Sequence, residues 1–157
     1  MKTSTAVVLA AASVSAVGVA LLGQQTKAFK QRDKHHRQHL DVALSCIQID
    51  WLSAVSTDDE LARIWAPEGV DPETYKSLMS ANRMACQLSL RDRLGFVSER
   101  QLRFYADSLA RTKAFRDYME RFGSTRAEEA VGDERASHFT SVLIDAAGRG
   151  DRSGAAR

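Results

Sequence analysis

The chain has 157 residues, of which 44% are hydrophobic, 27% charged and 7% aromatic. This length and composition are typical of one folded domain and exclude a disordered chain. Two cysteines are too few for a disulfide-built scaffold, and no Cys-x-x-Cys motif or Cys/His cluster indicates structural zinc. Because no catalytic signature is recognisable, the sequence predicts a location and a fold more sharply than a biochemical role.

Charge is distributed unevenly along the chain, whose formal net charge is +2. Residues 1–37 hold six basic side chains and one acidic one, a net charge of +5, and residues 38–157 carry a net charge of −3. An acidic surface repels phosphate groups, so we do not expect the folded part to bind nucleic acid. A short basic stretch next to an apolar one is typical of a segment that flanks a membrane.

The N-terminal segment has no charged residue between Thr3 and Thr26. As a helix this run would be about 36 Å long, which is enough to cross a bilayer. We therefore predict a transmembrane signal anchor over residues 1–26 and a basic juxtamembrane stretch over residues 27–39. The alternative is a cleaved secretory signal, since small residues surround Ser15, and the protein would then be secreted.

The orientation follows from the cations that flank the apolar run. Five basic residues lie on its C-terminal side, namely Lys27, Lys30, Arg32, Lys34 and Arg37. The more basic side remains in the cytoplasm, so we expect a single-pass protein of the cell membrane with its C-terminal domain in the cytoplasm. Ala12, Ala16 and Ala20 recur at four-residue spacing, which would allow a weak homodimer through close contact of two membrane helices.

Beyond the basic stretch, apolar residues at helical spacing predict a domain of about six short helices over residues 40–147. The first helix carries a stripe of apolar residues, namely Leu40, Leu44, Ile47, Trp51 and Val55. Thr57 and Glu60 match a capping box, which predicts a short second helix with Leu61, Ile64 and Trp65 on one face. Pro67 and Gly69 end that helix.

Capping residues also predict where the later helices begin. Asp71 and Pro72 begin a helix that ends at Gly95, with an inner face of Tyr75, Leu78, Met79, Asn82, Ala85, Cys86 and Ser89. Ser98 and Gln101 form a second capping box before a helix whose stripe is Leu102, Tyr105 and Leu109.

The last two predicted helices follow Thr112 and Asp133. The first has the stripe Phe115, Tyr118, Met119 and Phe122 and is expected to end at Gly123. The second carries Phe139, Val142, Leu143 and Ala146, and we expect a disordered tail over residues 148–157. No strand pattern occurs, so the predicted fold class is all-α.

Three residues are candidates for contacts within the core or with a partner: Asn82, Trp51 and Trp65. Asn82 is polar on an apolar face, where an amide usually bridges two helices, and a ligand or partner contact is the alternative. The two tryptophans occupy stripe positions and are predicted to lie in the core. The two cysteines, Cys46 and Cys86, are interpreted as small buried apolar residues.

No catalytic, cofactor-binding or metal-binding residue is predicted. His35 and His39 have the i,i+4 spacing that could hold a transition metal, but Lys34 and Arg37 would repel the cation, so we interpret the segment as a basic stretch. A pair of His138 with Glu134 or Asp145 lacks an accompanying nucleophile, which favours a surface histidine.

A resemblance to a family is carried by short motifs spread over the domain: His36-x-x-His39-Leu40, Trp51-Leu52, Glu60-Leu61-x-x-Ile64-Trp65-Ala66-Pro67, Asn82, Leu94-Gly95, Phe115-Arg116-x-Tyr118 and Phe139. Residues 35–147 resemble an uncharacterised domain-of-unknown-function family of small actinobacterial proteins. The resemblance implies an N-terminal membrane segment and a small helical domain, and it supplies no activity.

The sequence therefore leaves two functional classes. We expect a membrane-anchored helical module that binds an unknown protein partner at the cytoplasmic face of the bilayer. The alternative is a membrane-associated enzyme whose catalytic groups form no recognisable sequence motif. The first class is favoured because no set of acid, base, nucleophile or metal ligands stands out.

Overall fold

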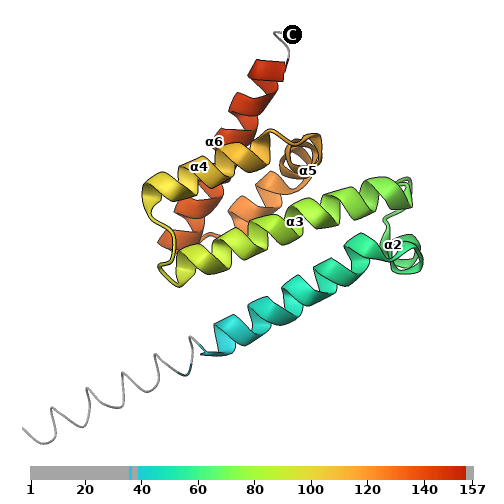
Figure 1. The fold of residues 1–157 in the computed structure, drawn as a ribbon, viewed down its shortest axis with the longest axis horizontal. Helices are drawn as coiled ribbons and strands as arrows, with labels where there is room; N and C mark the ends of the chain where they lie inside the picture. The colour runs from blue at the N-terminus through green and yellow to red at the C-terminus, as the bar shows by residue number, and fades with distance from the viewer. Residues whose placement is uncertain (1–35, 37–38, 155–157) are drawn as a thin grey trace, which may run out of the picture. The chain divides into compact units, whose positions relative to one another are not determined.

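The computed structural model describes residue 36 and residues 39–154. Contacts divide the chain into two units, residues 1–43 and residues 44–157, and the second unit holds the helical domain. Residues 39–57 are helical, and the part over residues 44–57 is called the first helix below. It is followed by α2 (Asp59–Trp65), α3 (Pro72–Arg93), α4 (Glu99–Ala110), α5 (Lys113–Glu129) and α6 (Glu134–Gly154) (Figure 1). The described residues form helices and no strand, which confirms the predicted all-α class.

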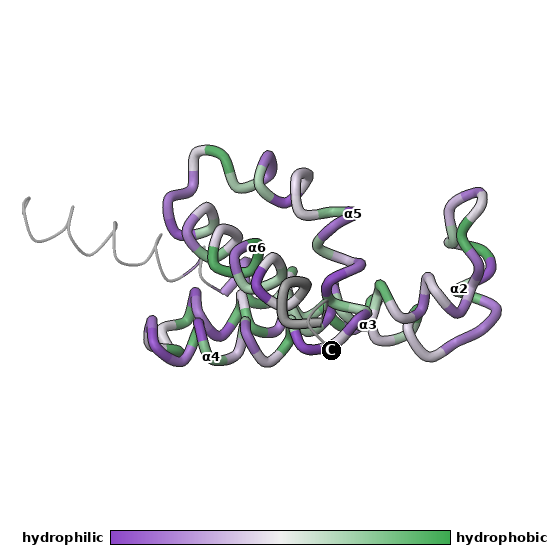
Figure 2. Tube along the Cα trace, turned by 90° about the horizontal axis from the view of Figure 1, so that it is seen from above, coloured by the Kyte–Doolittle hydropathy of each residue, from purple (hydrophilic) through white to green (hydrophobic). Residues whose placement is uncertain are grey.

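The core of the second unit lies where α6 packs against α4 and α5, and where α3 packs against α5 (Figure 1). Hydrophobic and hydrophilic stretches alternate along the helices in Figure 2, as they do in helices that bury one face. The largest fully buried side chains come from four of the helices, and they are Leu52, Val55, Leu102, Phe115 and Leu143. The predicted inner faces of α3, α4, α5 and α6 all contribute to this core.

Most of the predicted helix starts are confirmed by hydrogen bonds. The Asp71 carboxylate accepts from the backbone N–H of Glu73 and of Thr74. Ser98 and Gln101 form the complete capping box at the start of α4. At the start of α2 the prediction was wrong by one residue, because Asp58 is the N-cap, accepting from two backbone N–H groups, while the Thr57 hydroxyl bonds back to Ser53. A carboxylate accepts these amide hydrogen bonds better than a hydroxyl does.

The first helix does not bury the apolar stripe that the sequence predicts. Val55 is buried, but Leu44, Ile47 and Trp51 are exposed, and the side chain that is buried beside Val55 is Leu52. The Arg83 guanidinium of α3 donates to the Ser53 hydroxyl at 2.9 Å, on the same side as the buried residues. Of the predicted stripe only Val55 is therefore buried, and Leu52, which is not part of the stripe, is buried with it.

Helices α5 and α6 are longer than predicted. Helix α5 passes through Gly123, where an added Cβ would lie 3.6 Å from Met119 Cε, an ordinary packing distance. Helix α6 continues past Gly148 to Gly154, over residues where the sequence suggests a tail. Packing of α6 against α4 and α5 offsets the low helix propensity of its glycines.

Substitution of Gly150 is expected to destabilise the domain, because α6 passes close to the end of α4 there. A Cβ at Gly150 would lie 2.7 Å from the Ala110 carbonyl oxygen, whereas a Cβ at Gly148 would meet nothing within 4 Å. We expect Gly150→Ala to lower the free energy of unfolding by about 1–3 kcal/mol. The control Gly148→Ala should raise it by up to about 1 kcal/mol through helix propensity. Urea unfolding of both variants checks this, and equal stabilities would contradict the close approach.

Candidate functional site

Leu44, Ile47 and Trp51 on the first helix, together with Trp65 on α2, form one exposed apolar surface, which we call the tryptophan face. The exposed fractions of these side chains are 65%, 66%, 41% and 54% in that order. The first three are spaced by three and four residues and therefore lie on one side of the helix. The rings of Trp51 and Trp65 meet edge to face with centroids 5.7 Å apart, which joins α2 to the surface.

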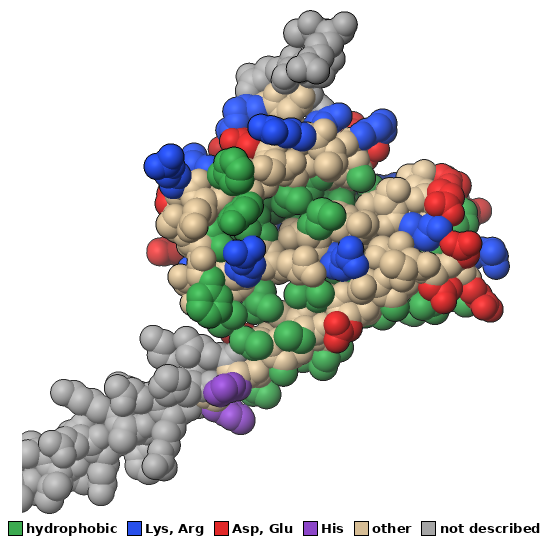
Figure 3. All heavy atoms as spheres, in the orientation of Figure 1, with side chains coloured by type: hydrophobic (Ala, Val, Ile, Leu, Met, Phe, Trp, Pro, Cys, Tyr) green, Lys and Arg blue, Asp and Glu red, His purple; other side chains and the backbone are tan. Residues whose placement is uncertain are grey.

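Acidic residues surround the α2 end of the tryptophan face. Residues 58–76 contain six acidic and two basic side chains. One of the two, Lys76, already pairs with Asp59 and Glu73, both at 2.6 Å. Figure 3 shows hydrophobic side chains along one edge of the first helix and acidic side chains gathered near α2. The surface is therefore apolar at its centre and negative at this end.

The prediction that Trp51 and Trp65 are core residues was wrong. Helix α2 has seven residues, of which Ala62 is the buried one. Within the described residues no further helix covers Ile64 and Trp65 at its end, so both side chains are exposed. Trp51 lies on the exposed side of the first helix, together with Leu44 and Ile47. The two tryptophans therefore cover each other instead of entering the core.

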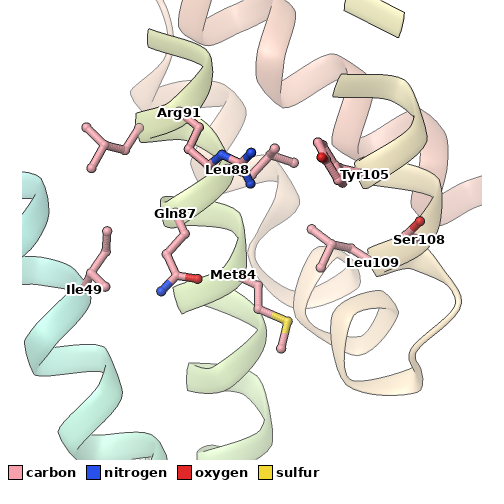
Figure 4. Close-up of a pocket in the computed structure, with 9 residues that line it drawn as sticks. Ile49, Met84, Gln87, Leu88, Arg91, Tyr105, Ser108 and Leu109 are labelled. Atoms are coloured by element: carbon pink, nitrogen blue, oxygen red, sulfur yellow. The ribbon is translucent and has the colours of Figure 1, made fainter. Parts of the chain in front are cut away.

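An apolar groove of about 450 Å³ lies between the first helix, α3 and α4 (Figure 4). Its walls include Ile49 of the first helix, Met84 and Leu88 of α3, and Leu109 of α4. The Arg91 guanidinium lies 5.4 Å above the centre of the Tyr105 ring, a cation–π contact at one end of the groove. The groove can accept an apolar side chain or alkyl group, and it brings together no acid–base pair.

Asn82 lies at the contact of α3 with α5, in a cluster of four polar side chains. Its Oδ1 accepts from the Tyr118 hydroxyl at 2.9 Å, from Arg126 Nη1 at 3.2 Å and from Cys86 Sγ at 3.4 Å. Arg126 Nη1 also donates to the Tyr118 oxygen at 2.9 Å. One amide oxygen thus joins two helices through three donors, and we call Asn82, Cys86, Tyr118 and Arg126 the Arg126 cluster.

The Arg126 cluster contains one permanent charge. Burial raises the pKa of the Tyr118 hydroxyl and of the Cys86 thiol, although the nearby Arg126 acts in the opposite direction. Both groups therefore remain protonated at neutral pH. The guanidinium of Arg126 stays charged under all physiological conditions. Its neighbours in the cluster, an amide, a hydroxyl and a thiol, are all neutral.

Two cavities adjoin Arg126. The larger, of about 210 Å³, lies between the first helix, α3, α5 and α6, and its polar lining includes Gln48, Ser89, Arg93, Arg126, Glu129 and Thr140. The smaller, of about 200 Å³, is lined by Gln48, Asn82, Tyr118, Thr125, Arg126 and Glu129, among others. The sequence pointed to Asn82 but not to Arg126, because Arg126 follows the glycine at which α5 was expected to end.

The histidines do not form a metal or catalytic site within the part of the chain that the structure describes. No group of three or more potential metal ligands occurs there. His138 pairs with Glu99 at 2.9 Å, instead of with Glu134 or Asp145, and so links α6 to α4. The hydrogen bond from His138 and then that from Arg103 hold the pKa of the Glu99 carboxyl below its usual value.

The predicted anchor over residues 1–26, with Ala12, Ala16 and Ala20, lies outside the described residues, as does His35. No helix within the described residues is both long enough and apolar enough to span a bilayer. The anchor and the weak homodimer through its small residues therefore stay predictions.

Comparison with known proteins assigns the chain to a family. The model of DUF6082, a family of unknown function, matches residues 2–156, and the chain belongs to this family. No curated protein and no solved structure is significantly similar to it.

Proposed function

We propose that this member of the DUF6082 family is a membrane-anchored helical protein that binds a protein partner through the tryptophan face, on the cytoplasmic side of the cell membrane. The anchor is supported by the uncharged run from Thr3 to Thr26 and by the basic residues that follow it. The binding role is supported by one observation above all, the exposure of Trp51 and Trp65 on a continuous apolar surface.

Exposed tryptophans favour protein binding over a purely structural role. Apolar patches on soluble domains mark interaction sites when they are contiguous, and tryptophan is among the residues enriched at the centres of interfaces. The ring of Trp65 is already held by Trp51, so the Trp65 side chain would lose little conformational entropy when a partner packs against it.

The charge around the tryptophan face specifies the partner. Its acidic end would be repelled by the anionic lipids of the cytoplasmic leaflet, which argues against the bilayer itself as the ligand. An amphipathic helix with an apolar stripe and basic flanking residues complements both the apolar centre and the negative end. We therefore propose a partner helix of this kind.

Membrane attachment is expected to survive alkaline carbonate extraction, because a spanning helix is held by burial of its apolar side chains and not by charge. The full chain should remain in the membrane pellet. Protease added outside the cell should digest the domain only after the membrane has been permeabilised, because the domain is on the cytoplasmic side. Intact protein in the soluble fraction would contradict the anchor. A shortened form in the culture medium would favour the cleaved signal and a secreted protein.

The two tryptophans of the chain provide an intrinsic fluorescence signal for the tryptophan face, since both of them lie in it. We expect emission close to that of tryptophan in water and efficient quenching by acrylamide. Trp65→Ala should cost only about 1–2 kcal/mol of stability, because half of the ring is exposed and the contact with Trp51 is the main loss. A loss of about 3–5 kcal/mol, as for a buried ring, would show that the tryptophan is part of the core.

Site-specific photo-crosslinking in intact cells tests the binding role. A photoreactive residue at Ile47 should give a discrete protein adduct, and the matched control at Phe104, an equally exposed position on α4, should not. The adduct should disappear when Trp65→Ala is combined with the probe at Ile47. Adducts to lipid alone, or equal protein adducts at both positions, would contradict the proposal.

A further inference from the structure

Arg126 is a partly buried cation that forms no ion pair within the described residues. Other arginines of the domain pair with carboxylates: Arg103 with Glu99, Arg135 with Asp92, and Arg149 with Asp107. Within the described residues Arg126 forms no such pair, and its Nε is buried without a hydrogen-bond partner. Because a partly buried charge is stabilised by a counter-charge, an anion from outside the chain would be held favourably beside Arg126.

The 210 Å³ cavity beside Arg126 has the lining that an oxyanion needs. Arg93 and Arg126 are the positively charged residues of this lining, and Glu129 is negatively charged. Gln48, Ser89 and Thr140 add an amide and two hydroxyl groups that can donate hydrogen bonds. The planar guanidinium of Arg126, which lines the cavity, matches the spacing of two oxygens on a phosphate.

The size of the cavity limits the ligand. Pockets for drug-sized ligands and cofactors occupy about 300–1,000 Å³, so this cavity is too small for a nucleotide coenzyme. It is large enough for a phosphate group with a few further atoms. Arg93 and Glu129 are exposed, which means that the cavity opens to solvent and the ion can enter without unfolding.

We propose that the cavity between the first helix, α3, α5 and α6 binds a small phosphate-type oxyanion, either inorganic phosphate or the phosphate group of a small monoester, with Arg126 as the principal ligand. Asn82 and Tyr118 act as positioning residues, since each accepts a hydrogen bond from Nη1 and so fixes the guanidinium beside the cavity. This site is independent of the tryptophan face.

Binding is tested with the full chain in non-ionic detergent, titrated calorimetrically with inorganic phosphate and, separately, with glycerol phosphate at constant ionic strength. We expect saturable binding that Arg126→Gln weakens by about tenfold or more. The matched control is Arg83→Gln, since Arg83 is also half-buried with an unpartnered Nε but lines neither cavity, and it should change the affinity by less than about twofold.

Two further variants keep the test decisive if Arg126→Gln unfolds. Glu129→Gln should tighten phosphate binding several-fold, because it removes the negative charge at the cavity. Asn82→Asp should abolish binding while retaining Arg126, because it places a carboxylate where the Asn82 amide oxygen now accepts from Arg126. Tighter binding of glycerol phosphate than of phosphate would identify a monoester as the ligand. Absence of saturable binding, or equal weakening by Arg83→Gln and Arg126→Gln, would overturn the proposal.

Discussion

Replacement of Phe115 by alanine is expected to lower the free energy of unfolding by about 3–5 kcal/mol. Phe115 is the largest of the fully buried side chains, with 1% of its surface exposed. It lies in the first turn of α5, where the Thr112 hydroxyl caps its backbone N–H. Truncation would leave a cavity where α5 joins the core and would remove the neighbour of the Tyr118 ring, whose centroid is 6.4 Å away.

Urea unfolding followed by circular dichroism measures this loss. Phe96→Ala is the matched control, because Phe96 is also a phenylalanine but is 71% exposed, and it should cost less than about 1 kcal/mol. Comparable losses for the two variants would mean that α5 is not seated in the core through Phe115. Phe115→Ala should also weaken phosphate binding, since Tyr118 positions Arg126.

Local sequence rules predicted the helix boundaries well where a short polar side chain satisfies backbone amides. Asp71, Ser98 and Asp133 all cap the helices that they were expected to cap. The apolar faces of α3 to α6 were also predicted, and residues of each of these faces lie in the core. In these elements the local pattern and the tertiary packing favour the same structure.

The first helix shows why periodicity alone cannot identify the buried face. The stripe from Leu44 to Trp51 has the right spacing for burial, yet the residues of this helix that lie in the core are Leu52 and Val55. Which side of a helix is buried depends on where the neighbouring helix lies, and that information is not local. The stripe from Leu44 to Trp51 remains exposed, and it is this surface that supports the proposed function.

Arg126 was not predicted as a site residue, because Gly123 was interpreted as the end of its helix. Glycine lowers helix stability by about 1 kcal/mol, which is too little to end a helix that packs along its length. With α5 continuous through Gly123, the four-residue spacing of Tyr118, Phe122 and Arg126 places all three on one side. The position of Asn82 opposite them depends on the packing of α3 against α5, which no sequence pattern specified.

The second large effect is expected at Asn82, where two substitutions should act in opposite ways. Asn82→Leu removes the acceptor of Tyr118 and Arg126 and should cost about 2–4 kcal/mol at neutral pH, because a charged donor is left without its partner. Asn82→Asp keeps an acceptor in the same place and adds a carboxylate among the hydrogen-bond partners of Arg126, which are now all neutral. We expect this variant to be at least as stable as the original chain in phosphate-free buffer at pH 7.

The pH dependence of the Asn82→Asp variant tests the reason for that stability. Arg126 should hold the pKa of the new carboxyl below its value in the unfolded chain, about 3.9. Its contribution is then complete above that pKa and is lost as the pH falls through the lower folded-state pKa, because both states become protonated. Thermal unfolding of the variant and the original chain at pH 7 and pH 3 measures this difference. An advantage as large at pH 3 as at pH 7, or a variant less stable than the original at pH 7, would show that Arg126 does not need an anion.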